Sequence, residues 1–297
     1  DRGQGVEAEI RVSTVPTAFG EKTVMRILDP DILLQEVDKL GMTSMDLVRY
    51  QQFINLPHGL VLVCGPTGSG KSTTLYSTLR YLSSEEKNIT TVEDPIEMVH
   101  EDFNQIGVQP SVDVTFASIL RNILRQDPDI IMVGEMRDLD TAENAIQAAL
   151  TGHLVLSTLH TNDAPLAITR MVDIGIPRFL INSTLIGVLA QRLLRKICPY
   201  CVEAFEIGTE AEVVTLKRGR GCIRCRGTGY LGRIGIFEVL PVTEPIRDLI
   251  DQEASAEAIR QAACREGMVT LRENAIGKMI EGQTTYQEVI RVTWEQI

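Results

Sequence analysis

Short apolar runs alternate with longer amphipathic stretches through the middle of the chain. The apolar runs have the length of buried strands, and the stretches between them repeat at helical spacing. The predicted strands are 60–64, 89–92, 130–133 and 154–158, and the predicted helices are 73–82, 115–125 and 141–150. This alternation predicts an α/β domain over residues 44–197, in which helices cover a mainly parallel sheet and binding loops lie at the carboxyl ends of the strands.

Period-two alternation marks the start of the chain. Residues 8–15 and 22–28 each alternate between polar and apolar side chains, and the turn-forming residues 16–21 separate them. We therefore expect a β-hairpin at the end of a β-rich domain. Each strand carries one arginine, Arg11 and Arg26, and a hairpin can place both on one surface.

The apolar segment 179–197 is long, but polar residues interrupt it. Because a bilayer-spanning helix needs roughly 20 apolar residues, we expect a core helix here and no transmembrane segment. Beyond it, one strand at 235–240 precedes small helices that begin near Thr243, Ser255, Thr270 and Thr284. The predicted units are the end of an N-terminal domain (1–30), a linker (31–43), the α/β domain (44–197), a tetracysteine subdomain (198–235) and a mainly helical C-terminal subdomain (236–297).

The stretch after the first predicted strand of the α/β domain has the pattern of a phosphate-binding loop. Its residues are Gly65, Pro66, Thr67, Gly68, Ser69, Gly70, Lys71 and Ser72, and Thr73 follows in the next predicted helix. Glycines let the backbone curl so that its N–H groups surround a chain of phosphates, and the helix N-terminus favours their charge. Lys71 suits the β- and γ-phosphates of ATP, and the Ser72 hydroxyl suits Mg²⁺. A glycine-rich turn that matched by chance would lack the flanking strand and helix.

Acidic residues and histidines follow other predicted strands. Glu135 comes just after the strand at 130–133, where a carboxylate can orient or deprotonate water or hold the Mg²⁺ shell. Glu93 directly follows another strand, so it is expected to face the same crevice rather than form part of a solvated loop. His160 lies just past a third strand, where it can sense a γ-phosphate, whereas His153 lies at the strand's other end. A hydrogen-bonded structural role is the alternative for both histidines.

Four of the six cysteines form two C-x-x-C pairs. Cys198 and Cys201 make the first pair, and Cys222 and Cys225 make the second. Four thiolates on two tight knuckles suit tetrahedral Zn²⁺. Two disulfides are the alternative, but a nucleotide-hydrolysing motor works in the reducing cytoplasm, where structural disulfides are rare. The remaining two, Cys64 and Cys264, are interpreted as core residues.

Composition narrows the class of protein. The chain has 297 residues, 44% hydrophobic and 23% charged, which is ordinary for a soluble globular protein. Its formal net charge of −11 argues against nucleic-acid binding through a broad basic surface. No signal-peptide pattern precedes the first strand. The chain opens on Asp1 without a methionine, so we interpret it as a fragment of a longer protein.

The motifs, in their order, resemble the secretion ATPase superfamily. The four boxes known there as Walker A, Asp box, Walker B and His box correspond to residues 65–72, 91–97, 124–138 and 151–163. The stretch 190–193 before the cysteine pairs, and residues 227–238, are similar to the assembly ATPases of type II secretion and type IV pilus extension. Pilus retraction ATPases generally lack the cysteine pairs. Met136 stands where the family usually has isoleucine, a volume-conserving exchange.

The resemblance implies a RecA-like P-loop NTPase preceded by part of a small α+β, PAS-like domain. It implies a homo-hexameric ATP-hydrolysing motor, without transmembrane segments, at the cytoplasmic face of the inner membrane. Membrane platform proteins would be its partners. In the family, the positions of Glu135 and Glu93 carry the catalytic carboxylates. Arg11 and Arg26 fall where arginines of the N-terminal domain reach the phosphates.

Two other functions remain open at this point. A RecA-like nucleic-acid translocase shares the phosphate loop, but the acidic balance and the lack of basic, aromatic-interleaved patches disfavour it. A nucleotide-binding scaffold without turnover is disfavoured because Lys71, Glu93 and Glu135 are all present. The residues do not distinguish secretion from pilus extension, and they identify neither the cargo nor the hexamer's symmetry.

Overall fold

The computed structural model describes residues 9–28, 33–209 and 212–294. Its strands are β1 (Glu9–Thr17), β2 (Gly20–Leu28), β3 (Gly59–Cys64), β4 (Ile89–Glu93), β5 (Asn104–Gly107), β6 (Ile130–Val133), β7 (Leu154–Leu159), β8 (Leu185–Ile197), β9 (Val202–Thr209), β10 (Glu212–Gly219) and β11 (Tyr230–Pro241). Its helices are α2 (Ser44–Ile54), α3 (Lys71–Leu82), α4 (Phe116–Ile123), α5 (Leu139–Leu150), α6 (Ala164–Ile174), α7 (Arg178–Thr184), α8 (Glu244–Asp251), α9 (Ala256–Arg265), α10 (Leu271–Ile280) and α11 (Tyr286–Thr293), with 3-10 turns at Val37–Lys39 and Pro110–Val112.

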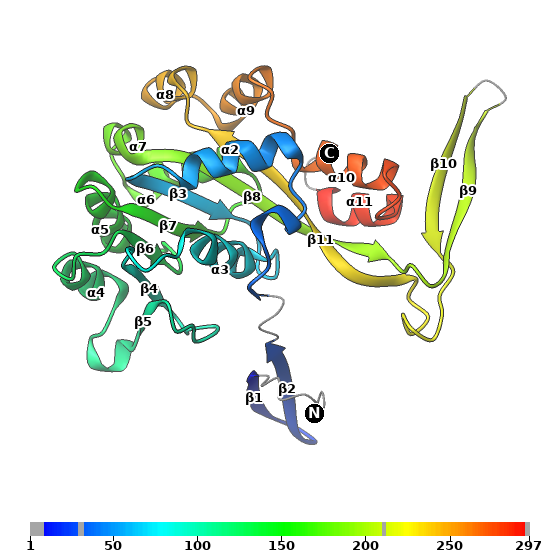
Figure 1. Cartoon of the computed structure of the whole chain (residues 1–297), viewed down its shortest axis with the longest axis horizontal. Coiled ribbons are helices and arrows are strands. Elements are labelled where there is room, and N and C mark those ends of the chain that lie inside the picture. Colours follow the sequence, from blue (N-terminus) through cyan, green and yellow to red (C-terminus); the bar gives the residue numbers. More distant parts are fainter. Residues whose placement is uncertain (1–8, 29–32, 210–211, 295–297) are drawn as a thin grey trace.

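A seven-stranded sheet, in the order β11-β8-β3-β7-β6-β4-β5, forms the centre of the molecule (Figure 1). The strands from β8 to β5 run parallel to one another, whereas β11 pairs antiparallel with β8. The predicted α/β fold with a mainly parallel sheet is therefore confirmed. The carboxyl ends of β3, β4, β6 and β7 meet at one edge of the sheet, where the sequence placed the phosphate loop, Glu93, Glu135 and His160.

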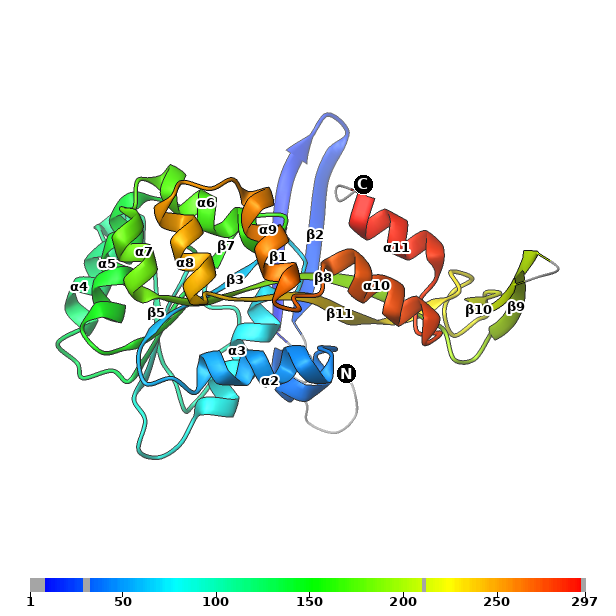
Figure 2. The same ribbon diagram turned by 90° about the horizontal axis from the view of Figure 1, so that it is seen from above.

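Helices cover both faces of the sheet. Along β3, Leu60 and Leu62 belong to one apolar core and Val61 and Val63 to the other, so the whole strand is buried. Figure 2 shows α2 and α3 on one side of the sheet and α6, α8 and α9 on the other. A strand buried on both faces reads as a continuous apolar run, which is the pattern that predicted these strands. None of the described helices has the length and apolar character needed to cross a bilayer.

The predicted core helix at 179–197 is wrong. Only Arg178–Thr184 is helical, as α7, and the chain then continues as the 13-residue strand β8. The first half of β8 is covered on both faces, so its apolar residues carry no period-two signal. Gly187 shows how tightly it is covered, because a Cβ there would lie 2.4 Å from the ring of Phe53 on α2.

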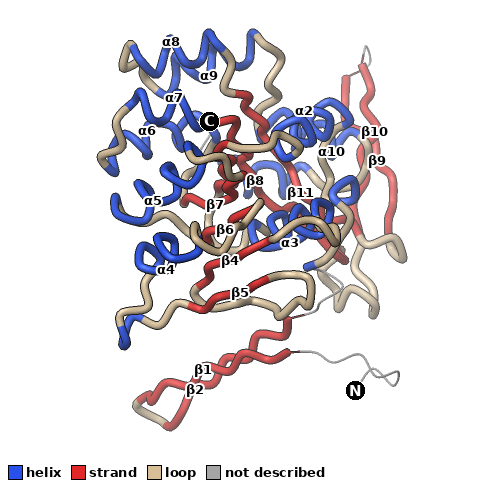
Figure 3. The backbone as a smooth tube through the Cα atoms, turned by 60° about the vertical axis from the view of Figure 1, so that its left-hand side comes forward, coloured by secondary structure: helices blue, strands red, loops and turns tan. Residues whose placement is uncertain are grey.

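The hairpin predicted at the N-terminus is confirmed as β1 and β2, which lie apart from the central sheet (Figures 1 and 3). Arg11 pairs directly with Arg26 in the register, so both positions share one face of the hairpin. The opposite face carries exposed Ile10, Val12, Met25 and Ile27, arranged as the pairs Ile10–Ile27 and Val12–Met25. Beyond the hairpin, the stretch predicted as a linker places four buried apolar residues against the body: Leu33, Val37, Leu40 and Met42.

The C-terminal third carries a projecting hairpin and four small helices. Strands β9 and β10 pair antiparallel and extend away from the sheet (Figures 1 and 2). Helices α8, α9, α10 and α11 follow β11, and their N-cap residues are Thr243, Ser255, Thr270 and Thr285. The predicted helix starts are thus correct to within one residue. Cys264 on α9 is exposed, so its interpretation as a core residue is wrong, whereas Cys64 is buried as expected.

Candidate functional site

The phosphate loop joins β3 to α3, as predicted. Gly68 and Gly70 have φ angles of 79° and 93°, a left-handed conformation in which glycine is favoured. The Lys71 ammonium lies against the loop and donates hydrogen bonds to the carbonyl oxygens of Gly65 at 2.7 Å and Pro66 at 3.3 Å. Partial burial lowers the pKa of Lys71, and the negative charge of Glu135 opposes that shift. The lysine therefore lies within the electrostatic field of the acidic candidate residue.

A cavity of about 390 Å³ opens beside this loop. Its lining combines residues from the carboxyl ends of several strands, namely Thr67, Gly68, Gly70, Lys71, Ser72, Thr73, Glu93, Glu135, Thr158 and His160. The fold thus brings together the phosphate-loop, acidic and histidine candidates from segments far apart in the sequence. Arg137 and Arg233 also line the cavity, although neither was predicted to do so. Both lie in stretches that resemble the family, 124–138 and 227–238, and Arg137 also stands two residues after Glu135.

Glu135 forms a charged group with two basic side chains. One oxygen of its carboxylate lies 2.7 Å from the Arg137 guanidinium, and the other lies 3.3 Å from Nε2 of His160. Partial burial raises the pKa of Glu135, but the hydrogen bond and charge of Arg137 and the nearby His160 and Lys71 outweigh burial and lower the pKa below its usual value. Glu135 is therefore ionised at neutral pH, as a base or a Mg²⁺-shell carboxylate must be.

Glu93 is held more firmly. Its side chain is buried and accepts hydrogen bonds from Tyr76 at 2.7 Å, Thr91 at 2.6 Å and Gln105 at 3.2 Å. These donors fix the carboxylate at the cavity wall. Such an arrangement suits a residue that orients water or a metal-bound ligand, and it leaves Glu135 as the less constrained of the two carboxylates.

The two histidines of the fourth motif have different surroundings. His160 is partly exposed and borders the cavity together with Glu135. His153 lies at the opposite end of β7, where its Nδ1 donates a hydrogen bond of 2.8 Å to the carbonyl oxygen of Ala148. The structural role is therefore supported for His153, and His160 keeps the candidate role.

Arg11 is exposed on β1 and is not among the described residues that line the nucleotide cavity. The backbone of Arg26 is described and lies opposite Arg11, but its side chain falls outside the described residues. A role for both arginines at the nucleotide remains a prediction. That role requires the hairpin to approach a nucleotide cavity.

A second cavity, of about 440 Å³, lies beyond the loop that follows His160. Asn162, Asp163, Arg192 and Arg260 are among its lining residues. It contains no residue of the phosphate loop, so we assign the nucleotide to the smaller cavity.

The smaller cavity fits a nucleoside triphosphate with Mg²⁺. A Cβ at Gly68 would meet no atom within 4 Å, so this side of the loop is open to a ligand. The hydroxyl of Ser72 and the two carboxylates of the lining supply the oxygen atoms that Mg²⁺ prefers.

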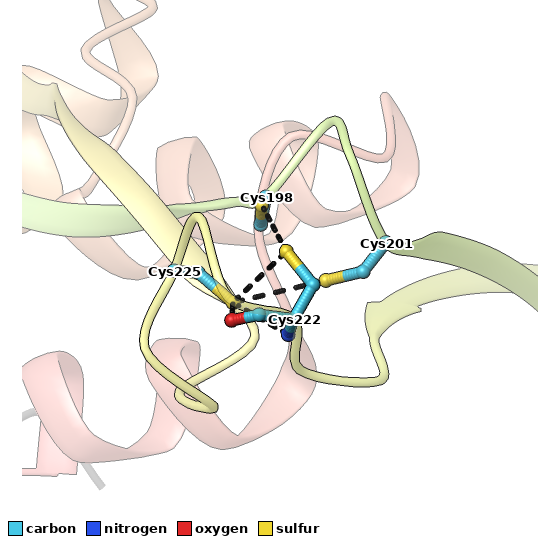
Figure 4. A group of neighbouring side chains, drawn as sticks. All are labelled: Cys198, Cys201, Cys222 and Cys225. Atoms are coloured by element: carbon cyan, nitrogen blue, oxygen red, sulfur yellow. Dashed lines mark hydrogen bonds between the residues drawn. The ribbon is translucent and has the colours of Figure 1, made fainter.

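The four cysteines of the two knuckles also lie together (Figure 4). Their Sγ atoms all lie within 4.8 Å of one another, with separations of 3.8 Å for Cys198–Cys222, 3.9 Å for Cys201–Cys225 and 3.7 Å for Cys222–Cys225. Tetrahedral Zn²⁺ with bonds of about 2.3 Å requires S···S separations of about 3.8 Å. None of the four is joined in a disulfide in the structure, and their spacing could hold one metal ion.

Backbone donors tune one of these thiols. The Sγ of Cys225 accepts hydrogen bonds from the backbone N–H of Cys222 at 3.1 Å and of Gly229 at 3.3 Å. Burial raises the pKa of Cys225, but these backbone donors and hydrogen bonds from the Cys222 and Cys201 thiols outweigh burial and lower the pKa to about 6. The thiolate form, which is the form that binds a metal, is therefore favoured.

Replacing Cys198 and Cys201 together by Ser should remove one Zn²⁺ per chain in metal analysis. A structural site contributes folding free energy, so the thermal midpoint of the variant should fall as well. Affinity for ATP should change far less, because none of the four cysteines lines the nucleotide cavity and the loop contacts β8 at Gln191 and Leu193, before the cysteines. Cys264→Ser is the matched control, since that thiol is exposed and remote from the cluster. Wild-type protein without metal under reducing conditions would contradict the zinc assignment.

The chain matches known proteins over nearly its whole length. Residues 3–291 match the model of the family described as type II/IV secretion system protein. The chain is 49% identical to type II secretion system ATPase E of Vibrio cholerae, covering 98% of this chain and 59% of the relative. It is 48% identical to type IV pilus assembly ATPase TfpB of Acinetobacter baylyi, covering 97% of this chain and 51% of the relative. The chain thus spans just over half the length of these curated relatives.

Solved structures show the same fold. The pilus retraction motor PilT, solved with bound ADP, superposes with a TM-score of 0.68 at 31% identity, covering 95% of this chain and 77% of that one. The Legionella pneumophila ATPase DotB superposes with a TM-score of 0.72 at 22% identity, covering 99% of this chain and 75% of that one, and supports the fold alone. On its motifs, its fold and these matches, the chain belongs to the type II/IV secretion system protein family.

Proposed function

We propose that this chain is the catalytic part of a Mg²⁺-dependent ATPase motor that powers assembly of a secretion pseudopilus or a type IV pilus. The observation that carries the proposal is the cavity in which Lys71, Glu135 and His160 converge at the carboxyl edge of the sheet. The names of the relatives, which include ATPases of both machines, support the same reaction. Because both names occur at almost equal identity, the proposal concerns the shared chemistry.

Binding is assigned to the phosphate loop and Lys71. Backbone N–H groups of the loop would surround the phosphates, and the ammonium of Lys71 would exchange its contacts with Gly65 and Pro66 for phosphate oxygens. Ser72 and a carboxylate at the strand ends would hold Mg²⁺, which when bound neutralises charge on the β- and γ-phosphates. PilT, which carries ADP in its solved form, supports a nucleotide ligand.

Hydrolysis is assigned to the carboxylates. The ionised Glu135 accepts a proton from the attacking water, and His160 and Arg137 hold its carboxylate in place. Glu93, fixed by Tyr76 and Thr91, orients the attacking water. Each step uses a residue of the cavity lining.

Mechanical work requires a part that moves when ATP is bound and hydrolysed. The hairpin β1–β2 presents the positions of Arg11 and Arg26 on one face, and its opposite face has the apolar character of a domain interior. We infer that a domain containing this hairpin closes over ATP and brings the arginines to the phosphates. In the proposed motor six copies form a ring at the cytoplasmic face of the inner membrane, where platform proteins receive the motion.

Arg11→Ala and Arg26→Ala should each reduce ATP turnover of the full-length, assembled protein by about tenfold or more, because an arginine finger commonly contributes about 10³–10⁵ in rate. Nucleotide binding without Mg²⁺ should stay near the wild-type level.

Phosphate release, measured with and without DNA, tests the function itself. Hydrolysis that does not depend on DNA supports the motor, and strong stimulation by DNA would favour the nucleic-acid translocase.

Lys22→Ala is the control for this experiment. Lys22 is an exposed cation on the same face of the hairpin, opposite Val15, so the variant removes charge without touching the arginine pair. If both arginine variants hydrolyse ATP within about twofold of wild type, they form only surface contacts of about 0–1 kcal/mol, and domain closure through this hairpin is refuted.

A further inference from the structure

Gln191 is a buried polar residue in β8, only 2% exposed, in a strand that otherwise contributes apolar side chains to the core. Strand β8 lies next to β3, and the phosphate loop that leaves β3 passes over it. A Cβ added at Gly65 would come within 2.6 Å of the Gln191 carbonyl oxygen, and one at Gly70 within 3.1 Å of its Nε2. The loop therefore rests directly on this residue.

The carboxamide of Gln191 bridges two parts of the loop and its helix. Its Nε2 donates a hydrogen bond of 2.8 Å to the carbonyl oxygen of Ser69, and its Oε1 accepts one of 2.7 Å from the hydroxyl of Thr74. Because the Ser69 carbonyl can only accept, the amide nitrogen must face the loop. Thr74 thereby fixes the orientation of the amide from the other side.

The bond to Ser69 determines the direction of a second group. In a trans peptide the carbonyl of one residue and the N–H of the next point in opposite directions. Anchoring the Ser69 carbonyl toward β8 therefore turns the Gly70 N–H away from β8, and Gly70 lines the nucleotide cavity. A backbone N–H held toward the cavity before the ligand arrives needs no rearrangement to bind a phosphate.

We propose that Gln191 is a positioning residue that presets the phosphate loop for nucleotide binding by holding the Ser69–Gly70 peptide in the orientation that directs the Gly70 N–H at the phosphates. It acts through the loop and does not touch the nucleotide. The inference rests on the proposed function in that it takes the ligand to be a nucleoside di- or triphosphate. Both ADP and ATP are affected, since each carries a phosphate chain.

Gln191→Met, which keeps the volume but removes both hydrogen bonds, should weaken binding of Mg²⁺-ATP by about tenfold, the equivalent of one to two ordinary hydrogen bonds. The measurement is calorimetric titration of the full-length protein with Mg²⁺-ATP and Mg²⁺-ADP, beside its thermal midpoint. Asn182→Leu is the matched control. Asn182 is a half-buried carboxamide on α7 that donates to the carbonyl oxygen of Arg247 and to the Asp251 carboxylate, and it does not line the nucleotide cavity. The control should lose stability and bind both nucleotides like wild type.

Gln191→Glu supplies a readout that a purely structural role would not give. The introduced carboxyl can donate to the Ser69 carbonyl only when protonated, and burial raises the pKa of a carboxyl, by up to about 3–5 units when it is complete. Its affinity relative to wild type should therefore be lowest near pH 8 and recover toward pH 6. Affinity that stays low at every pH would overturn the proposal, as would Gln191→Met binding within about twofold of wild type.

These outcomes separate the positioning role from the proposed function. If the wild-type protein itself binds no Mg²⁺-ATP, the proposed function fails. If wild type binds and both Gln191 variants bind equally well at every pH, only the role of Gln191 is overturned. Should Gln191→Met not fold, Gln191→Glu decides the question, and an affinity for Mg²⁺-ATP that does not change with pH relative to wild type overturns the role.

Discussion

Glu135→Gln is expected to reduce ATP turnover by a factor of about 10²–10⁴, the usual contribution of a general base, while ATP stays bound. The amide has the size and shape of the carboxylate but cannot accept a proton from water at neutral pH. Binding should persist because the phosphate loop is untouched, and the loss of negative charge near the phosphates favours the anion. Phosphate release and calorimetric ATP affinity, measured on the same sample, give the two numbers.

The charge network around Glu135 makes the result specific. Arg137 at 2.7 Å and His160 at 3.3 Å would each lose a charged partner, so a moderate fall in stability is expected. Asp140→Asn removes a carboxylate from the exposed first turn of α5, outside the cavity, and should hydrolyse ATP normally. Wild-type turnover in Glu135→Gln would show that the catalytic carboxylate is another residue, with Glu93 the first candidate.

Lys71→Ala is expected to weaken ATP binding by roughly ten- to a hundredfold, because a hydrogen bond to a charged group is worth about 1.5–3 kcal/mol. The ammonium is the loop's own side-chain counter-ion for the phosphates, and the variant also frees the carbonyl groups of Gly65 and Pro66. Turnover should fall at least as far as binding. Titration with Mg²⁺-ATP tests the binding loss directly.

A charge-removing variant elsewhere provides the comparison for Lys71→Ala. Lys87 is exposed in the turn before β4 and has no place in the cavity lining, so Lys87→Ala should bind ATP like wild type. If Lys71→Ala binds as tightly as this control, the loop does not hold the phosphates and the nucleotide assignment is wrong.

Much of the site was predictable because its residues lie next to the strand ends that carry them. Lys71 follows β3, Glu135 follows β6 and His160 follows β7, each within a few residues of an apolar run. Parallel strands bring such neighbours to one edge whatever the details of packing. The cysteine cluster was predictable for the same reason, since each C-x-x-C pair forms a knuckle from local sequence alone.

Other features depend on partners distant in the chain. The first half of β8 is covered on both faces, so its apolar run looks the same for a buried helix and a buried strand. Only the pairing with β3 and β11 decides between them. Gln191 gave no signal of its role for the same reason, because Ser69 and Thr74 lie more than a hundred residues earlier. Cys264 was placed in the core from its helical surroundings, yet its side chain lies on the outer face of α9.

The pairing of β8 with β11 also bears on how this architecture can change over evolutionary time. Ile197 and Tyr230, which flank the whole tetracysteine segment, are partners across the ladder. Antiparallel neighbours can be joined by a turn of two residues. The segment 198–229 is therefore a topological appendage, and a single deletion or insertion event could remove it or add it without rerouting any strand. The edge of the sheet that carries the nucleotide cavity and the segment that carries the four cysteines can thus evolve separately within one chain.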